Sequence, residues 1–422
     1  MDQAEIKNHA AELANWIQWL SSFGRVETGG VTRLLYDKAW CQAQNALQGK
    51  MKKLGFTTYF DDVGNLFGRM NGRSNPSNSV LTGSHIDTVV NGGKFDGAYG
   101  VLASLLAVSR LIQRYGSPLR SIEVVSLCEE EGSRFPLSFW GSGNITGTYT
   151  LSDAANIVDS NGVSLVEAMQ QAGFGKGDYL PALRQDIACF IETHIEQGQI
   201  LELEKKSWAP VSHIVGQRRY TLTVTGESNH AGTTPMCLRK DALYASAKMI
   251  TALIDRANRL TNGLTATCGK IQGEPNVANV IAGRCLFTLD IRHHETAVLD
   301  EFSRNALHDC HKIAEQAGLA LEINKWMDVN PVRLDPALTQ CNLQLGQVAG
   351  VDCRTMVSGA GHDSQIFAVH CPTSLLFVPS HEGISHSPEE YTDSVSLEIG
   401  VQMLMRVLYQ QAYTSSTKLE EQ

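Results

Sequence analysis

Apolar residues in the first half of the chain recur at helical spacing in some segments and form short, strand-like runs in others. We expect helices at 3–20, 37–54 and 100–114, and strands at 79–84 and 121–128. Alternation of this kind predicts an α/β layer structure around a mixed, mostly parallel sheet.

The order of elements changes between about residues 213 and 328. The expected elements are a strand, a helix, two strands, a helix and a strand, at 219–226, 240–259, 264–272, 284–292, 296–317 and 319–326. This is the β-α-β-β-α-β order of a ferredoxin-like unit.

Two periodicities inside this segment predict how it packs. Alternate positions in the strand at 284–292 are apolar, which predicts one packed face and one largely polar face; the apolar positions are Cys285, Phe287, Leu289 and Ile291. The helix at 240–259 has apolar residues at helical spacing, which we expect to form its buried stripe; they are Leu243, Ala247, Ile250 and Ile254.

After residue 329 the pattern returns to helix and strand, with a last amphipathic helix at 393–413. The middle unit therefore looks inserted into the first. We expect a discontinuous catalytic domain of 1–212 and 329–422 and a second domain of 213–328. Two domains are also the usual expectation for 422 residues, since single hydrophobic cores rarely grow that large.

Charge, apolar stretches and cysteine spacing argue against several classes of protein. The net charge of −9 argues against a nucleic acid or an anionic membrane as partner. No stretch reaches the roughly 20 apolar residues of a membrane span, and the N-terminus lacks the pattern of a secretory signal. The cysteines form no C-x-x-C pair, so we expect reduced thiols and a cytoplasmic location.

Charged residues that follow apolar runs are the candidates for chemistry, because ligands in open α/β sheets bind at the strand ends. These candidates are His85 with Asp87, Asp96 among glycines, Glu129 to Glu131, His194 and His386. Each alone has a simpler interpretation, such as a hydrogen-bonded loop pair, a helix cap or a solvated acidic face. Taken together, these residues point to a chemical site more specifically than any one of them does.

Histidine and carboxylate side chains without thiolates suit Zn²⁺, Mn²⁺ or Co²⁺. A pair of ions requires one carboxylate that can bridge them, and Asp96 is the natural choice. Two such ions lower the pKa of water and polarise a carbonyl group, which hydrolysis of a urea-type or amide bond requires.

Several motifs together carry a resemblance that covers nearly the whole chain. They are GSHIDTVVNGG, EEEGSRFP, HIEQG, GESNHAGTTPM and SGAGHD. The chain resembles the aminoacylase/carboxypeptidase-type metal hydrolases, in particular their N-carbamoyl-amino-acid and allantoate amidohydrolase branch. The resemblance implies a di-metal peptidase-like catalytic domain and an inserted lid and dimerisation domain.

The resemblance also implies roles for the candidates at the strand ends. Two divalent ions would be bound, with Asp96 bridging; the implied ligands are His85, Asp96, Glu131, His194 and His386. Glu130 would be the general base that takes a proton from water and returns it to the leaving nitrogen. Asp87 would orient His85.

A second group of residues is implied to bind substrate. His230, Asn279 and Arg292 would form a lid pocket over the metals and would come from the partner subunit of a homodimer. Arg292 would hold the substrate carboxylate and His230 would stabilise the oxyanion. Gln197, His362 and Gln217 would also contact substrate. The simpler interpretations are a surface arginine at 292 and a turn asparagine at 279.

The resemblance implies allantoate as substrate, with ureidoglycine, ammonia and carbon dioxide as products in purine-nitrogen catabolism. An N-carbamoyl-L-amino-acid hydrolase or a β-ureidopropionase is the alternative, since the same groups would serve any ureido acid. A non-catalytic metal-binding receptor for ureido acids is a further alternative. Glu130 beside Glu131 favours an enzyme, because a receptor needs no general base.

Overall fold

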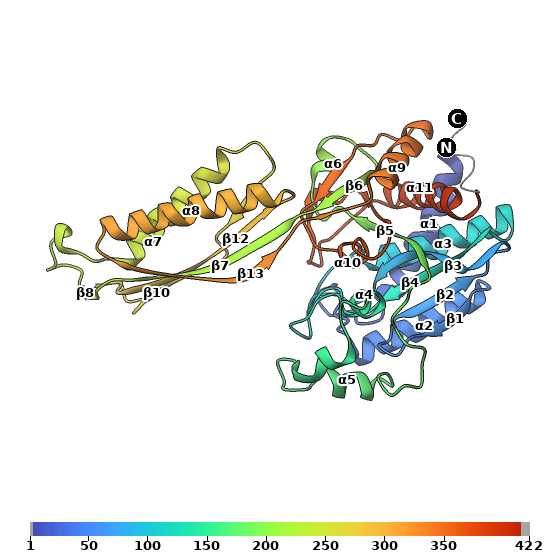
Figure 1. The fold of residues 1–422 in the computed structure, drawn as a ribbon, viewed down its shortest axis with the longest axis horizontal. Coiled ribbons are helices and arrows are strands. Elements are labelled where there is room, and N and C mark those ends of the chain that lie inside the picture. The colour runs from blue at the N-terminus through green and yellow to red at the C-terminus, as the bar shows by residue number, and fades with distance from the viewer. Residues whose placement is uncertain (1–2, 415–422) are drawn as a thin grey trace. The chain divides into compact units, whose positions relative to one another are not determined.

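The computed structural model of the protein describes residues 3–414, which form two compact units (Figure 1). One unit combines the residues up to Ser212 with those from Arg333 onward, and the other is His213–Val332. The boundary expected at 328/329 lies inside strand β13 (Ala320–Val329), a few residues before the second unit ends at Val332.

The first unit is built on a sheet with strand order β1-β2-β4-β3-β5-β16-β6-β14, and β15 pairs with β6. Its strands are β1 (Thr57–Phe60), β2 (Leu66–Met70), β3 (Asn75–His85), β4 (Arg120–Leu127), β5 (Ile187–Ile195), β6 (Ala209–Ile214), β14 (Val332–Arg333), β15 (Met356–Ser358) and β16 (Thr373–Val378). The central strands β4, β3, β5 and β16 are parallel, whereas β1, β2 and β6 pair antiparallel to their neighbours. The sheet is therefore mixed, and its parallel part is confined to the centre.

Helices cover both faces of this sheet. They are α1 (Gln3–Ser21), α2 (Lys38–Lys53), α3 (Ala98–Tyr115), α4 (Trp140–Thr146), α5 (Leu165–Gln171), α6 (Ile200–Leu203), α9 (Pro336–Val348), α10 (Asp363–Phe367) and α11 (Ser394–Ala412). Val124 of β4 packs with α3 and α11, and Val125 packs on the other face with Phe367 of α10. Because both faces are covered, β4 and β16 are buried along nearly their whole length.

The second unit has four main strands in the order β10-β12-β7-β13, all paired antiparallel, with β9 also paired to β12. Its elements are β7 (Gly216–Thr225), β8 (Asn229–His230), α7 (Ala242–Asn258), β9 (Thr265–Thr267), β10 (Ile271–Glu274), β11 (Val280–Ile281), β12 (Arg284–His293), α8 (Thr296–Gln316) and β13. Helices α7 and α8 pack on one face of the sheet (Figure 1). The order is that of a ferredoxin-like unit.

The alternation in β12 is as predicted, with residues 285, 287, 289 and 291 buried. The stripe predicted for α7 is wrong. The helix buries Ala242, Ala245, Met249 and Leu253 instead, while Leu243 and Ala247 are exposed. Apolar residues occupy more than one face of this helix, so periodicity alone did not identify the buried one.

The strand expected at 264–272 is divided into β9 and β10, which both pair with β12 on either side of a break around Gly269. The small β8–β11 ribbon was not predicted, because each strand has only two residues. Among the described helices, none is both long and apolar enough to cross a bilayer.

Candidate metal centre

The candidate residues of the first unit gather at one edge of its sheet. The parallel strands β3, β4, β5 and β16 end side by side there. His85 is the last residue of β3, and His194 is the next to last residue of β5. Glu129 to Glu131 follow β4 closely, and the loop after β16 carries His386. The fold thus brings together side chains that are far apart in the sequence.

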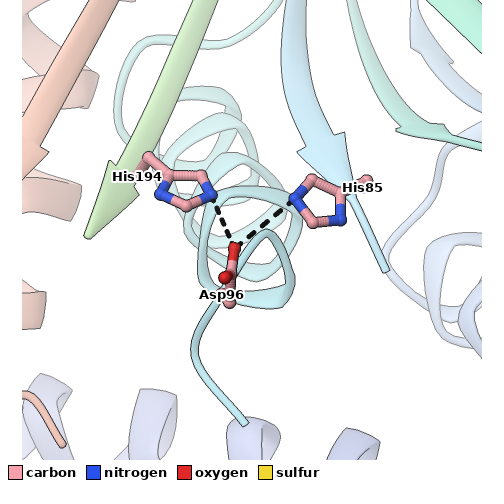
Figure 2. A group of neighbouring side chains, drawn as sticks. All are labelled: His85, Asp96 and His194. Atoms are coloured by element: carbon pink, nitrogen blue, oxygen red, sulfur yellow. Dashed lines mark ion pairs between the residues drawn. The ribbon is translucent and has the colours of Figure 1, made fainter. Parts of the chain in front are cut away.

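His85, Asp96 and His194 form the first donor cluster (Figure 2). Asp96 Oδ1 lies 3.1 Å from His194 Nε2 and 3.6 Å from His85 Nε2. The Nδ1 atom of each ring lies within hydrogen-bond distance of a backbone oxygen, at 3.0 Å from that of Asp87 for His85 and 2.9 Å from that of Ile195 for His194. A proton on Nδ1 satisfies these bonds and leaves the Nε2 lone pairs directed at the carboxylate, as in metal-binding histidines.

Gly97 allows Asp96 to reach this position. Its φ is +59°, and a Cβ atom there would lie 2.4 Å from the His85 ring. Its backbone N–H points to His194 Nε2 at 3.0 Å. Both the backbone conformation and the close approach of the imidazole require glycine.

Asp96, Glu131 and His386 form the second donor cluster, in which the ligand atoms all lie within 4.8 Å of one another. His386 Nε2 is 3.2 Å from Asp96 Oδ2 and 3.5 Å from Glu131 Oε2. The two oxygens of Asp96 therefore face different clusters. This is the arrangement expected of a carboxylate that bridges two ions.

The electrostatics of the donors fit divalent cations. Burial raises the pKa of Glu131 to about 8, and the charge of Asp96 adds to the effect. The hydrogen bond to Asp96 raises the pKa of His386 to about 9. Carboxylates crowd together here with too little positive charge to compensate them. Divalent ions would supply that charge, and the nitrogen and oxygen donors suit them.

Glu130 lies beside the clusters without belonging to either. Its Oε2 is 3.9 Å from His85 Nε2, and its side chain is buried. Burial raises the pKa of Glu130 well above its usual value, and Glu131 contributes in the same direction. A carboxylate with a raised pKa next to a metal site is suited to accept and return a proton.

Asp87 contacts both His85 and the glutamate loop. Its backbone oxygen is the partner of His85 Nδ1, whereas its carboxylate oxygen Oδ1 is 3.7 Å from that atom. Its Oδ2 accepts the backbone N–H groups of Glu130 at 3.0 Å and Glu131 at 3.1 Å. Asp87 is thus placed to orient His85 mainly through its backbone, while its carboxylate holds the loop of Glu130 and Glu131.

The two predicted substrate residues of this unit, Gln197 and His362, lie in different positions relative to the donor clusters. Gln197 Nε2 donates to Asp96 Oδ2 at 2.8 Å and lies 3.4 Å from His386 Nε2, so this side chain faces the donors. His362 is buried, with its ring centroid 4.6 Å from that of His194 and its Nε2 3.1 Å from Ser358 Oγ. His362 thus packs against the candidate ligand His194. Its contact with substrate stays a prediction.

The predicted lid residues do not come together within one chain. Gln217 and Arg292 are register partners at one end of the β7–β12 ladder, where Arg292 pairs with Asp290 at 3.0 Å. His230 and Asn279 lie beyond the other end, in the β8–β11 ribbon and its approach. The eight residue steps from Arg284 to Arg292 along the ladder alone span roughly 27 Å at about 3.4 Å per residue.

Backbone donors around His230 favour one tautomer of its neutral ring. The backbone N–H groups of Gly232 and Thr233 donate to its Nδ1 at 3.0 and 3.2 Å. A neutral ring with this accepting nitrogen carries its proton on Nε2. The N–H of Ala231 donates to the backbone oxygen of Asn279 at 3.0 Å, which joins the two predicted residues.

Arg33 is a site residue that the sequence analysis did not find. It is buried, and its guanidinium donates to the backbone oxygens of Ile86 at 2.5 Å and Leu20 at 3.0 Å. Burial lowers the pKa of Arg33 to about 10, although the nearby charge of Asp87 opposes this. The side chain braces the loop after His85. An arginine between a threonine and a leucine gives no signal of this in the sequence.

Replacement of the shared carboxylate tests the donor clusters. We expect Asp96→Asn to weaken binding of both ions by about 100-fold or more, because even the loss of a group that supports a metal ligand costs 10- to 100-fold. Metal content after dialysis and calorimetric titration would measure this. Asp352→Asn, at an exposed position, is the control. Unchanged binding of either ion by Asp96→Asn would contradict the shared role.

Comparison with known proteins places the chain in a family. The model for peptidase family M20/M25/M40 matches residues 81–410. The chain is 50% identical over 401 residues to an allantoate amidohydrolase of Bacillus subtilis (95% of this chain, 97% of that one). It is 47% identical over 397 residues to an allantoate amidohydrolase of Escherichia coli (94% and 97%).

More distant relatives agree. An N-carbamoyl-L-amino-acid amidohydrolase of Paenarthrobacter aurescens is 35% identical over 405 residues (95% and 98%). A crystal structure of an amidase of the hydantoinase/carbamoylase family from Burkholderia multivorans superposes with a TM-score of 0.92 at 35% identity (96% and 98%). The predicted di-metal peptidase-like fold is thereby confirmed, and the chain belongs to peptidase family M20/M25/M40.

Proposed function

We propose that the protein is a metal-dependent amidohydrolase that converts allantoate to ureidoglycine, ammonia and carbon dioxide in purine-nitrogen catabolism. The observation that carries the reaction class is the Asp96 carboxylate shared by two donor clusters, with Glu130 beside them. The substrate is inferred from the relatives of 47% and 50% identity, which are allantoate amidohydrolases. Ten free cysteines support a cytoplasmic location.

The mechanism assigns each step to a residue of this chain. Bound divalent ions would polarise a ureido carbonyl and lower the pKa of water. Glu130 takes a proton from the water that adds to this carbonyl and passes it to the nitrogen that leaves as the C–N bond breaks. The remaining carbamate decomposes to ammonia or amine and carbon dioxide. His230 donates its Nε2 proton in a hydrogen bond to the developing oxyanion.

We propose Mn²⁺ or Zn²⁺ as the ions, with Co²⁺ also compatible. The ligands would be His85, Asp96 and His194 for one ion and Asp96, Glu131 and His386 for the other. The donor set is imidazole and carboxylate without thiolate, which these metals accept.

Substrate contacts would come from two chains of a homodimer. Arg292 and His230 lie at opposite ends of β12, too far apart for one small ureido acid, so one chain would supply the guanidinium and the other the imidazole. This revises the expectation that all lid residues come from one partner. Arg292 would then exchange Asp290 for the substrate carboxylate, which a planar guanidinium can hold with two hydrogen bonds.

The surface of the second unit supports a partner chain. Several large apolar side chains near α7 and β10 are exposed, namely Met236, Leu238, Leu243, Tyr244 and Ile271. Strand β10 is at the edge of its sheet. Exposed apolar groups beside a strand edge favour association with another chain.

Hydrolysis of N-carbamoyl-L-amino acids is the second candidate function. The relative from Paenarthrobacter aurescens carries that name at 35% identity. The proposed ions and Arg292 would serve these substrates equally well, since they share the ureido group and the carboxylate.

A rate comparison decides between the two substrates. We expect metal-stripped protein to release ammonia from allantoate only after Mn²⁺ or Zn²⁺ is restored, and to act more slowly on N-carbamoyl amino acids and on β-ureidopropionate. Initial rates on each substrate at matched concentrations measure this preference. Faster turnover of a carbamoyl amino acid would replace the first assignment with the second.

Substitution of Glu130 tests its proposed role as the general base. We expect Glu130→Gln to retain both ions and to lower kcat by about a hundredfold to ten-thousandfold, the usual contribution of a positioned acid–base group. Metal analysis and allantoate kinetics on one preparation would show this. Glu167→Gln is the same substitution at an exposed position and should leave kcat unchanged. If Glu130→Gln turned over at most of the wild-type rate, another group would have to move the proton.

Mixed dimers test whether sites are built from two chains. Arg292→Ala and His230→Ala proteins should each be nearly inactive. Co-refolded in equal amounts, they should recover about one quarter of wild-type activity, because half the dimers are mixed and each mixed dimer keeps one intact site. Mixing Arg292→Ala with the double variant is the control. No recovery would mean that one chain supplies both residues.

A further inference from the structure

Glu390 connects the C-terminal segment to the backbone of the shared carboxylate. It lies in the loop after β16, and its side chain is buried, with 3% of the residue exposed. Its Oε1 accepts the backbone N–H of Phe95 at 2.9 Å and that of Asp96 at 3.1 Å. The position of the Asp96 backbone therefore depends on a side chain nearly 300 residues away in the sequence.

The same residue also holds both neighbours of His386. Ser385 Oγ donates to Glu390 Oε2 at 2.9 Å, and the backbone N–H of Glu390 donates to the backbone oxygen of Ser387 at 3.0 Å. His386 itself has a φ of +56° and a half-exposed side chain. No regular element lies between Gly383 and Ser394, so side-chain contacts hold this loop in place. They include the contacts of Glu390 and those of Gln197 and Asp96 with Ser385 and His386.

The first donor cluster depends on Glu390 less directly, only through the backbone of Asp96. His85 and His194 lie at the ends of core strands β3 and β5, and their Nδ1 atoms bond to the backbone of Asp87 and Ile195. These contacts do not involve Glu390. Only Asp96 is common to both clusters.

We propose that Glu390 is a positioning residue that assembles the second donor cluster by fixing the turn of His386 against the backbone of Asp96. The inference rests on the metal binding proposed above. It adds that the two donor clusters are assembled in different ways. The first cluster is formed mainly by the strand ends, whereas the second exists only while the loop is tied down.

Gly93 provides the space for this connection. A Cβ atom at Gly93 would lie 2.1 Å from Glu390 Oε1 and 2.6 Å from its Cβ. Any side chain at position 93 would therefore displace the Glu390 carboxylate. Gly93→Ala disturbs the connection without removing the glutamate.

Cobalt titration of the full-length, metal-stripped protein tests the proposal, followed by visible absorption and calorimetry. Wild-type protein should bind two Co²⁺ per chain. Glu390→Ala should weaken the second ion by about 10- to 100-fold, the usual cost of losing a group that supports a metal ligand, and the first by less than about threefold. Gly93→Ala should show the same selective loss.

Conservative and neighbouring variants separate positioning from general stability. Glu390→Gln should bind both ions within about threefold of wild type, because its amide oxygen can accept the same two N–H groups and its NH2 group can donate to Ser385 Oγ, which then accepts. Glu389→Ala is the matched control: this adjacent glutamate is exposed and hydrogen-bonds to Ser387 Oγ.

Three outcomes would overturn the proposal. They are unchanged binding of both ions by Glu390→Ala, an equal loss of both ions, or a selective loss that Glu389→Ala reproduces. If Glu390→Ala did not fold, Gly93→Ala and Glu390→Gln would carry the test. Failure of the proposed metal binding itself is distinguishable, because the wild-type protein would then bind fewer than two ions.

Discussion

The metal centre depends on one carboxylate placed between two groups of ligands. Asp96 directs Oδ1 at His85 and His194 and Oδ2 at His386, so its side chain is shared by both groups. The surroundings are arranged around this point. Parallel strands deliver the histidines, Gly97 lets the carboxylate approach them, and Glu390 holds the backbone from the opposite side.

This arrangement buries negatively charged carboxylates, which is energetically unfavourable. Glu130 and Glu131 have raised pKa values, mainly through burial. Among the described residues, the Arg33 guanidinium is a buried cation near Asp87, and it is already bonded to backbone oxygens. The protein therefore concentrates acid groups that favour a cationic ligand, at the expense of stability when no ligand is bound.

The sequence was sufficient for much of the fold and for the residues at strand ends. His85, Glu131 and His194 lie at or just after segments with a strand-like pattern, so this pattern and charge located them. Glu390 could not be found in this way. Glu389 and Glu390 stand side by side in an irregular loop, and Glu390 is the buried one, in the space left by Gly93 and hydrogen-bonded to the backbone of Asp96. Likewise α7 has apolar residues on several faces, and packing in three dimensions chose one of them.

The contact between Gly97 and His85 limits how this chain can vary. The atoms that would obstruct a side chain at position 97 belong to the candidate ligand itself, 2.4 Å from a Cβ atom. A second mutation elsewhere cannot relieve the obstruction without moving the imidazole that the centre needs. Position 97 must therefore remain glycine during evolution. Even a mutation that adds only a methyl group there would remove the function and would not merely adjust it.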